Sequence, residues 1–155
     1  MIKIKTTVFL ILVLFLFNNC GYTPQYAKKD NLNFSIEIIG LSGDRDFNNA
    51  FKTKLSKYSV KKGFDEKIFK INVVSKYEKN TSLKDSSGTT TEYELNIKVG
   101  FKVTYENVEK NITIKDSFRM KKMSDSFEES NYEKIIKNNF AETIKEKLLF
   151  NLIRM

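Results

Sequence analysis

The feature that most constrains the fold is a strict alternation of apolar and polar residues over positions 92–106. The odd-numbered positions of this stretch hold large apolar or aromatic residues, namely Tyr93, Leu95, Ile97, Val99, Phe101, Val103 and Tyr105. The even-numbered positions are mostly charged or polar. Because successive side chains of a β-strand point to opposite faces, the pattern predicts a long strand with one buried and one wet face. Such strands are typical of antiparallel sheets.

Shorter runs of the same alternation predict three more strands, at residues 34–39, 67–78 and 108–120. Glu106 and Asn107 mark a tight turn into the last of these strands. Residues 79–91 are rich in Ser and Thr and contain Gly88, so we expect a polar loop there. Asp116 interrupts the apolar face of the last strand. We therefore expect a β-bulge or a register change that moves its carboxylate to solvent.

Two segments have the apolar spacing of amphipathic helices. The first covers residues 44–58, and Asp44 is its expected N-cap, because an aspartate oxygen can accept a hydrogen bond from the first turn. The second covers residues 131–153, with Ser130 or Asn131 as its expected N-cap. A charged loop at residues 121–130 should precede it.

The element order is therefore β-α-β-β-β-α. The crossover through the first helix should place the first two strands parallel. Both helices need an apolar partner, and the single apolar face of the sheet can accept both. We expect an α+β fold, a two-layer sandwich with two helices packed on one face of a four-stranded mixed sheet and the other face open.

The N-terminus has the pattern of a lipoprotein signal. Residues 6–17 are apolar, follow Lys3 and Lys5, and are too few for a membrane span of about 20 residues. Cys20 comes directly afterwards, so we expect cleavage before it and lipid attachment to its thiol. We expect residues 1–19 to be the signal peptide, 20–33 the lipidated N-terminus and leader, and 34–155 a single α+β domain.

The three residues before Cys20 depart from the usual lipobox, because Phe17, Asn18 and Asn19 replace its leucine and small residues. An uncleaved N-terminal anchor therefore stays open as an alternative. Gly21, where an aspartate would favour retention in the inner membrane, points to sorting to the outer membrane.

The residue inventory excludes several classes of chemistry. The sequence has no His and one Cys, which excludes His-based catalysis, an internal disulfide and a Cys-cluster metal site. Capping and solvation explain the acidic pairs at Asp44/Asp46 and Glu128/Glu129. We expect no catalytic residue, no metal and no cofactor. The strand aromatics lie opposite its lysines, so we also expect no nucleic-acid partner.

The net charge is +8, and Lys3 and Lys5 contribute two of these charges from the removable segment. A basic surface favours anionic partners such as phosphorylated glycolipid. Arg119, Lys121 and Lys122 form the densest basic cluster. They are our candidates for contact with lipopolysaccharide phosphates, with a solvated loop as the alternative reading.

The start Cys20-Gly21-Tyr22-Thr23-Pro24 and the order of elements resemble the LPS-assembly lipoprotein LptE family. Gln25-Tyr26 matches only in part the Leu-Tyr that follows the proline in that family. The resemblance implies an outer-membrane lipoprotein that faces the periplasm and has no enzyme activity. It also implies that this lipoprotein plugs the LptD β-barrel and assists its assembly. The pair inserts lipopolysaccharide into the outer leaflet.

Two other functions stay open. One is a lipoprotein that binds and activates a peptidoglycan synthase, which usually needs a longer leader than residues 20–33. The other is an inhibitor of a secreted hydrolase, which would favour a disulfide-stapled domain.

Overall fold

A computed structural model describes residues 34–59 and 67–155 of the chain. Cys20 and the expected signal peptide and leader lie outside this part. The described elements, in chain order, are β1 (Phe34–Gly43), α2 (Arg45–Leu55), the 3₁₀ turn η3 (Ser56–Tyr58), β2 (Lys67–Lys84), β3 (Thr90–Tyr105), β4 (Val108–Lys121) and α3 (Ser126–Ile153).

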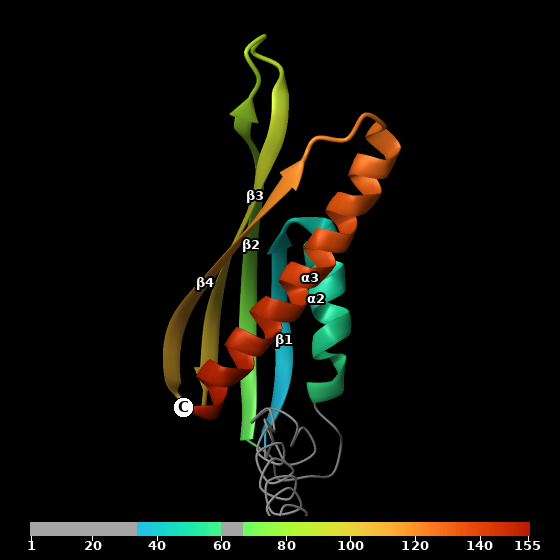
Figure 1. The fold of residues 1–155 in the computed structure, drawn as a ribbon. Helices are drawn as coiled ribbons and strands as arrows, with labels where there is room; N and C mark the ends of the chain where they lie inside the picture. Colours follow the sequence, from blue (N-terminus) through green and yellow to red (C-terminus); the bar gives the residue numbers. More distant parts are fainter. Residues whose placement is uncertain (1–33, 60–66) are drawn as a thin grey trace, which may run out of the picture. The chain divides into compact units, whose positions relative to one another are not determined.

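The four strands form one sheet in the order β1-β2-β3-β4. β1 runs parallel to β2, and the two other pairs are antiparallel. Both helices lie on the same face of the sheet and pack against each other (Figure 1). The expected α+β sandwich, with its element order and its mixed sheet, is therefore confirmed.

The core lies between β3 and the helices, as the alternation predicts. Five consecutive odd-numbered residues of β3 are buried, namely Leu95, Ile97, Val99, Phe101 and Val103. On α2, the rings of Phe47 and Phe51 stack at 5.6 Å between centroids, and Phe51 meets Phe101 at 5.7 Å. Burial of these large side chains is the main favourable term for folding.

The start of α2 is confirmed, but the start of α3 differs from the prediction. Asp44 Oδ1 accepts a hydrogen bond from the Phe47 N–H at 2.8 Å and caps α2. Asp125, rather than Ser130 or Asn131, caps α3 by accepting from the backbone N–H groups of Phe127 and Glu128. The two acids of the first turn, Glu128 and Glu129, complement the positive end of the helix dipole. The charged loop at residues 121–130 is correspondingly shorter.

The polar loop expected at residues 79–91 is wrong, because most of this segment is strand. β2 and β3 continue as a long hairpin that projects past the helices (Figure 1). The Asp85 carboxylate closes its turn by accepting from the N–H groups of Ser87 and Thr89, each at 2.9 Å, and Gly88 has a φ of +84°. Both faces of the projecting part are wet, so its composition is polar although its backbone is extended.

The register change expected at Asp116 is also wrong. β3 and β4 pair without interruption from Glu92 opposite Lys121 to Tyr105 opposite Val108. Asp116 therefore stays on the helix-facing side, opposite Ile97, and Lys147 of α3 lies 3.9 Å from its carboxylate. A cation from the neighbouring helix offsets the charge, so the strand does not need a bulge.

Candidate functional site

The face of the sheet that carries no helix holds a row of three lysines. Lys76 on β2 lies directly opposite Lys98 on β3, and Lys98 lies directly opposite Lys115 on β4. All three side chains are exposed. Like charges directly opposite on adjacent strands destabilise a sheet. The row therefore lowers stability, and folding does not explain it.

The neighbouring rows of the same face mix residue types. One row towards the hairpin turn, Glu78, Asn96 and Ser117 lie side by side. One row in the other direction, β3 carries only Gly100, which lies between Val74 and Thr113. No other row in the part of the sheet that the structure describes consists of three like charges.

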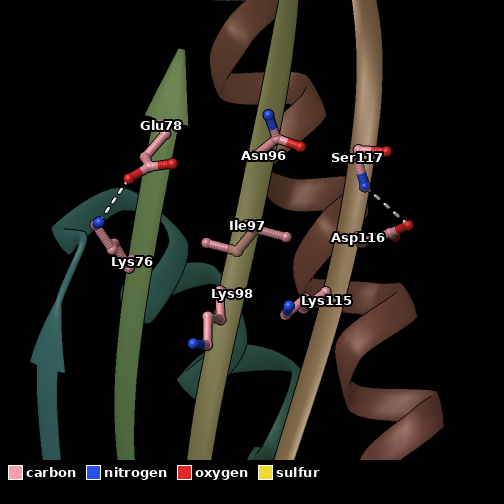
Figure 2. A pocket seen from close by; sticks show the side chains of 8 residues that line it. All are labelled: Lys76, Glu78, Asn96, Ile97, Lys98, Lys115, Asp116 and Ser117. Atoms are coloured by element: carbon pink, nitrogen blue, oxygen red, sulfur yellow. Dashed lines mark hydrogen bonds and ion pairs between the residues drawn. The ribbon is translucent and has the colours of Figure 1, made fainter. Parts of the chain in front are cut away.

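The lysine row lines a depression of about 550 Å³ in this face (Figure 2). Lys76 forms an ion pair with Glu78 at 2.6 Å. Within residues 34–59 and 67–155, no carboxylate lies within ion-pair distance of Lys98 or Lys115. In Figure 2, the ammonium group of Lys115 lies towards β3 and that of Lys98 towards β2. The depression thus holds two cationic groups without an anionic partner.

The basic residues singled out from the sequence lie close to this depression. Arg119 and Lys121 occupy the same face of β4, four and six residues beyond Lys115, and Lys122 follows the end of the strand. All three are exposed. Their charges are better balanced than those of the lysine row, because Arg119 lies opposite Glu94 and Lys121 opposite Glu92.

The lysine row does not stand out in the sequence, because its members are 22 and 17 positions apart along the chain. Only the strand register brings them together. The available signal was that each lysine sits at an outward position of an alternating strand.

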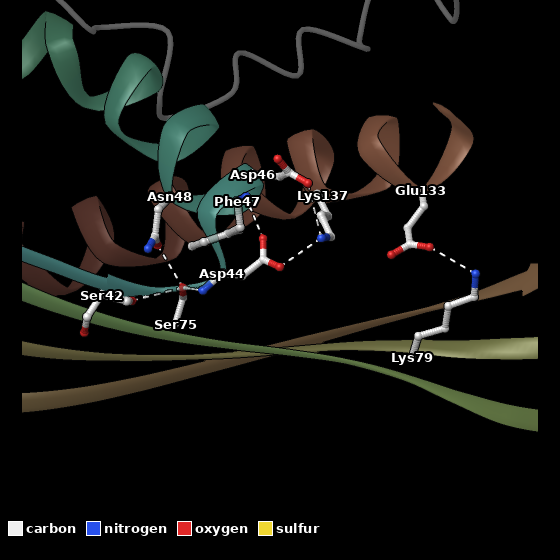
Figure 3. Close-up of polar contacts among 9 residues, drawn as sticks. All are labelled: Ser42, Asp44, Asp46, Phe47, Asn48, Ser75, Lys79, Glu133 and Lys137. Atoms are coloured by element: carbon white, nitrogen blue, oxygen red, sulfur yellow. Dashed lines mark hydrogen bonds and ion pairs between the residues drawn. The ribbon is translucent and has the colours of Figure 1, made fainter. Parts of the chain in front are cut away.

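A second polar cluster lies on the inner face, where β2 meets both helices (Figure 3). Beyond Val73 the inward residues of β2 change from apolar to polar: Ser75, Tyr77 and Lys79. Ser75 Oγ donates to Asn48 Oδ1 at 2.8 Å and accepts from the Asp44 N–H at 2.9 Å. These bonds join β2 to the start of α2.

Two lysines connect this cluster to α3. The ammonium group of Lys137, whose side chain is 11% exposed, lies 2.9 Å from Asp44 Oδ2 and 4.2 Å from the Tyr77 ring centroid. Lys79 lies 2.7 Å from Glu129 Oε1 and 3.0 Å from Glu133 Oε2.

The hydrogen bond from Lys79 is the largest cause that holds the pKa of Glu129 below its ordinary value. Each of these charges has a partner inside the fold. The cluster therefore fastens the helices to the sheet, and the charges of Lys79, Lys137 and Asp44 are all paired within it.

The described residues hold no group of three or more His, Cys, Asp or Glu side chains that could bind a metal ion. No helix among them is long and apolar enough to cross a membrane.

Comparisons with known proteins give structural matches alone. No family model matches the sequence, and no curated protein matches it. The crystal structure of the rare lipoprotein B from Shewanella oneidensis matches with a TM-score of 0.54 and 16% identity, over 78% of this chain and 96% of that chain. The solution structure of an uncharacterized lipoprotein B from Nitrosomonas europaea matches with a TM-score of 0.52 and 16% identity, over 77% of this chain and 86% of that chain.

At this identity the likeness concerns the fold, and it agrees with the resemblance found in the sequence. The sheet covered by two helices on one face is similar in fold to the structures of rare lipoprotein B.

Proposed function

We propose that this protein is an outer-membrane lipoprotein that binds inside the LptD β-barrel, assists its assembly and takes part in the insertion of lipopolysaccharide. The observation that carries the proposal is the lipoprotein B fold, found in a chain whose Cys20–Pro24 start resembles the LptE family. In this proposal Cys20 carries the lipid and the domain faces the periplasm. Its role is binding, without catalysis.

The length of the leader supports a site of action close to the membrane. Fourteen peptide units separate Cys20 from Phe34, the first residue of β1. A fully extended chain spans at most about 3.6 Å per residue, so the domain starts within roughly 50 Å of its lipid. This reach suits a partner in the same membrane better than a synthase across the periplasm.

The polar surface of the sheet supports a position inside a β-barrel. The interior of a membrane β-barrel is polar, so a protein inside it needs a polar exterior. The face without helices is lined mainly by charged and amide side chains. Arg119, Lys121 and Lys122 are the residues that we propose for contact with lipopolysaccharide phosphates.

Affinity purification of the full-length protein from outer membranes tests the proposal. We expect a large β-barrel in one-to-one ratio, and we expect depletion of the protein to lower the amount of folded barrel. A Cys20→Ala variant serves as the control and should lose both its acylation and its outer-membrane location. Recovery of a peptidoglycan synthase instead of a barrel would contradict the proposal and favour the synthase activator.

A further inference from the structure

β4 is an edge strand of the sheet over its whole length (Figure 1). It pairs with β3 without a bulge, and in the described part of the chain no strand pairs with its other side. β1, the opposite edge strand, is less regular: its register shifts between Ile38 and Gly40, and Ser59 bridges to its Ile36. A long, regular edge such as that of β4 is a template for a further strand.

The odd-numbered residues of β4 present their backbone groups at this edge. The Lys122 N–H, directly after the strand, bonds to Thr91 O of β3 at 2.9 Å. Because hydrogen-bonded and non-hydrogen-bonded pairs alternate in an antiparallel ladder, the even-numbered residues bond to β3 and the odd-numbered ones point outward. The contact of Lys147 Nζ with the Lys115 carbonyl, at 3.5 Å, agrees with this assignment. The edge therefore offers a row of donors and acceptors to another strand.

The helix-facing side of β4 has a self-complementary order of residue types. Along the strand this side carries, in turn, an apolar residue, a cation, two apolar residues, an anion and an apolar residue. They are Val108, Lys110, Ile112, Ile114, Asp116 and Phe118. The two end residues, Val108 and Phe118, are 62% and 41% exposed. The same order in reverse would place apolar opposite apolar and cation opposite anion.

A second β4, antiparallel to the first and centred on Thr113, provides this reversed order. The pairs on the helix-facing side are Val108 with Phe118, Lys110 with Asp116, and Ile112 with Ile114. The pairs on the other side contain no like charges: Thr113 with itself, Asn111 with Lys115, and Glu109 with Ser117. Opposite charges and apolar pairs directly across two strands stabilise a sheet.

A shift of the centre by one residue destroys this match. A centre at Ile112 would place Asp116 opposite Val108, and a centre at Ile114 would place it opposite Ile112. Charges on the inward side of an edge strand ordinarily prevent pairing. Here Lys110 and Asp116 disfavour the wrong registers and permit one, so they select the partner as well as the register.

The helix layer can continue into the second copy. Helix axes pack about 8–10 Å apart, roughly twice the spacing of strands, so two helices cover four strands and a second pair covers the next four. On the flank of α3 towards β4, Tyr132 contacts Phe118 and remains exposed. Phe150, three residues after Lys147, is also exposed. The α3 helix of a second copy would lie beside this flank.

We infer that β4 is a self-association surface, through which two copies of this chain pair as antiparallel strands centred on Thr113. The dimer has one continuous sheet with the helices of both copies on one face. An interface made by one strand is small, so we expect a dissociation constant on the order of 1–10 µM. The pairing concerns copies that are not inside a barrel and does not rest on the proposed function.

Cysteine cross-linking of the purified full-length protein in neutral detergent tests the register. At about 100 µM, Thr113→Cys should form a disulfide-linked dimer, because Cα atoms in a hydrogen-bonded antiparallel pair are about 5.5 Å apart. Asn111→Cys and Lys115→Cys should each fail alone, since their own copies would be roughly 14 Å apart along the strands. Mixed together, these two variants should cross-link. The wild-type chain, whose sole cysteine is Cys20, is the control.

Substitutions at the edge test the interface without cross-linking. Thr113→Pro removes an outward N–H and leaves the bonds to β3 in place, so sedimentation velocity should show at least tenfold weaker dimerisation. Lys110→Glu places like charges at two symmetric positions and should weaken the dimer by about tenfold. Lys134→Glu, the same change on exposed α3, is the matched control and should change it less than about twofold.

Circular dichroism checks that each variant is folded. A folded Thr113→Cys protein that stays monomeric would overturn the inference. Equal cross-linking of all three single-cysteine variants would also overturn it, because it would indicate chance collisions. Barrel recovery is measured separately in outer membranes, so failure of the proposed function leaves this result intact.

Discussion

The two faces of the sheet follow different rules. On the inner face, neighbouring residues complement one another: the apolar positions of β3 fill the space under the helices, and Lys79 and Lys137 meet carboxylates. On the outer face, three lysines lie side by side, and Val74 remains exposed beside Gly100. The comparison teaches that stability accounts for the residues of the inner face but does not account for the lysine row of the outer face.

The largest effect expected from this difference is the loss of a buried ring. Phe101→Ala should lower the free energy of unfolding by about 3–5 kcal/mol, because it leaves a cavity between β3 and α2. Lys102→Ala, on the outer face of the same strand, should cost less than about 1 kcal/mol. Urea denaturation compares the two. Similar midpoints would mean that the faces are assigned in reverse.

A smaller effect should come from the buried charges of the inner face. Lys137→Met should cost about 2 kcal/mol or more, because it leaves the Asp44 carboxylate without its partner at 2.9 Å. Asp44→Asn keeps a good helix cap and removes that charge, so the double variant should recover part of the loss. Lys134→Met on the exposed side of α3 is the control. Additive losses in the double-mutant cycle would contradict the coupling.

The inner face should also make stability sensitive to acid. The pKa of Glu129 is lowered in the folded protein, chiefly by the hydrogen bond from Lys79. Its contribution is complete above the unfolded pKa of about 4.3 and is lost as the pH falls through the folded pKa. Denaturation at several pH values should show this loss. Glu129→Gln should reduce it, and an unchanged acid profile would count against the role of this bond.

The smallest changes in stability are expected for substitutions on the outer face. The sign of each change shows whether the replaced lysine helps to hold the sheet together. Lys98→Glu should stabilise the protein by up to about 1 kcal/mol at low salt, because it faces lysines on both sides. Lys102→Glu should destabilise it slightly, because Lys102 pairs with Glu109 at 2.9 Å. Thermal melts at low and high salt measure both changes. Destabilisation by Lys98→Glu would show that the lysine row helps to hold the sheet together.

The same contrast explains how far the sequence could be interpreted. On the inner face, every second side chain of a strand is buried. The alternation over residues 92–106 alone therefore predicts a strand and its buried side. The projecting end of the β2–β3 hairpin has no buried side, so its polar composition resembles a loop. Asp125 caps α3 through a local pattern of one aspartate and two following acids, which was available in the sequence.

The remaining features depend on contacts between distant residues. Asp116 stays in register because Lys147, 31 residues later, lies next to it. The lysine row exists only through the register of three strands. Single-sequence patterns predict elements and faces, but pairing across the sheet decides which outward side chains meet. This is why the fold was predicted and the candidate site was missed.

The most direct test measures stability and binding on one variant, Lys98→Gln/Lys115→Gln. If the outer face is maintained for a partner at a cost to stability, the free energy of unfolding should rise or stay constant while recovery of the β-barrel with the variant falls. A variant that loses stability and still recovers the barrel would contradict the division of roles between the two faces.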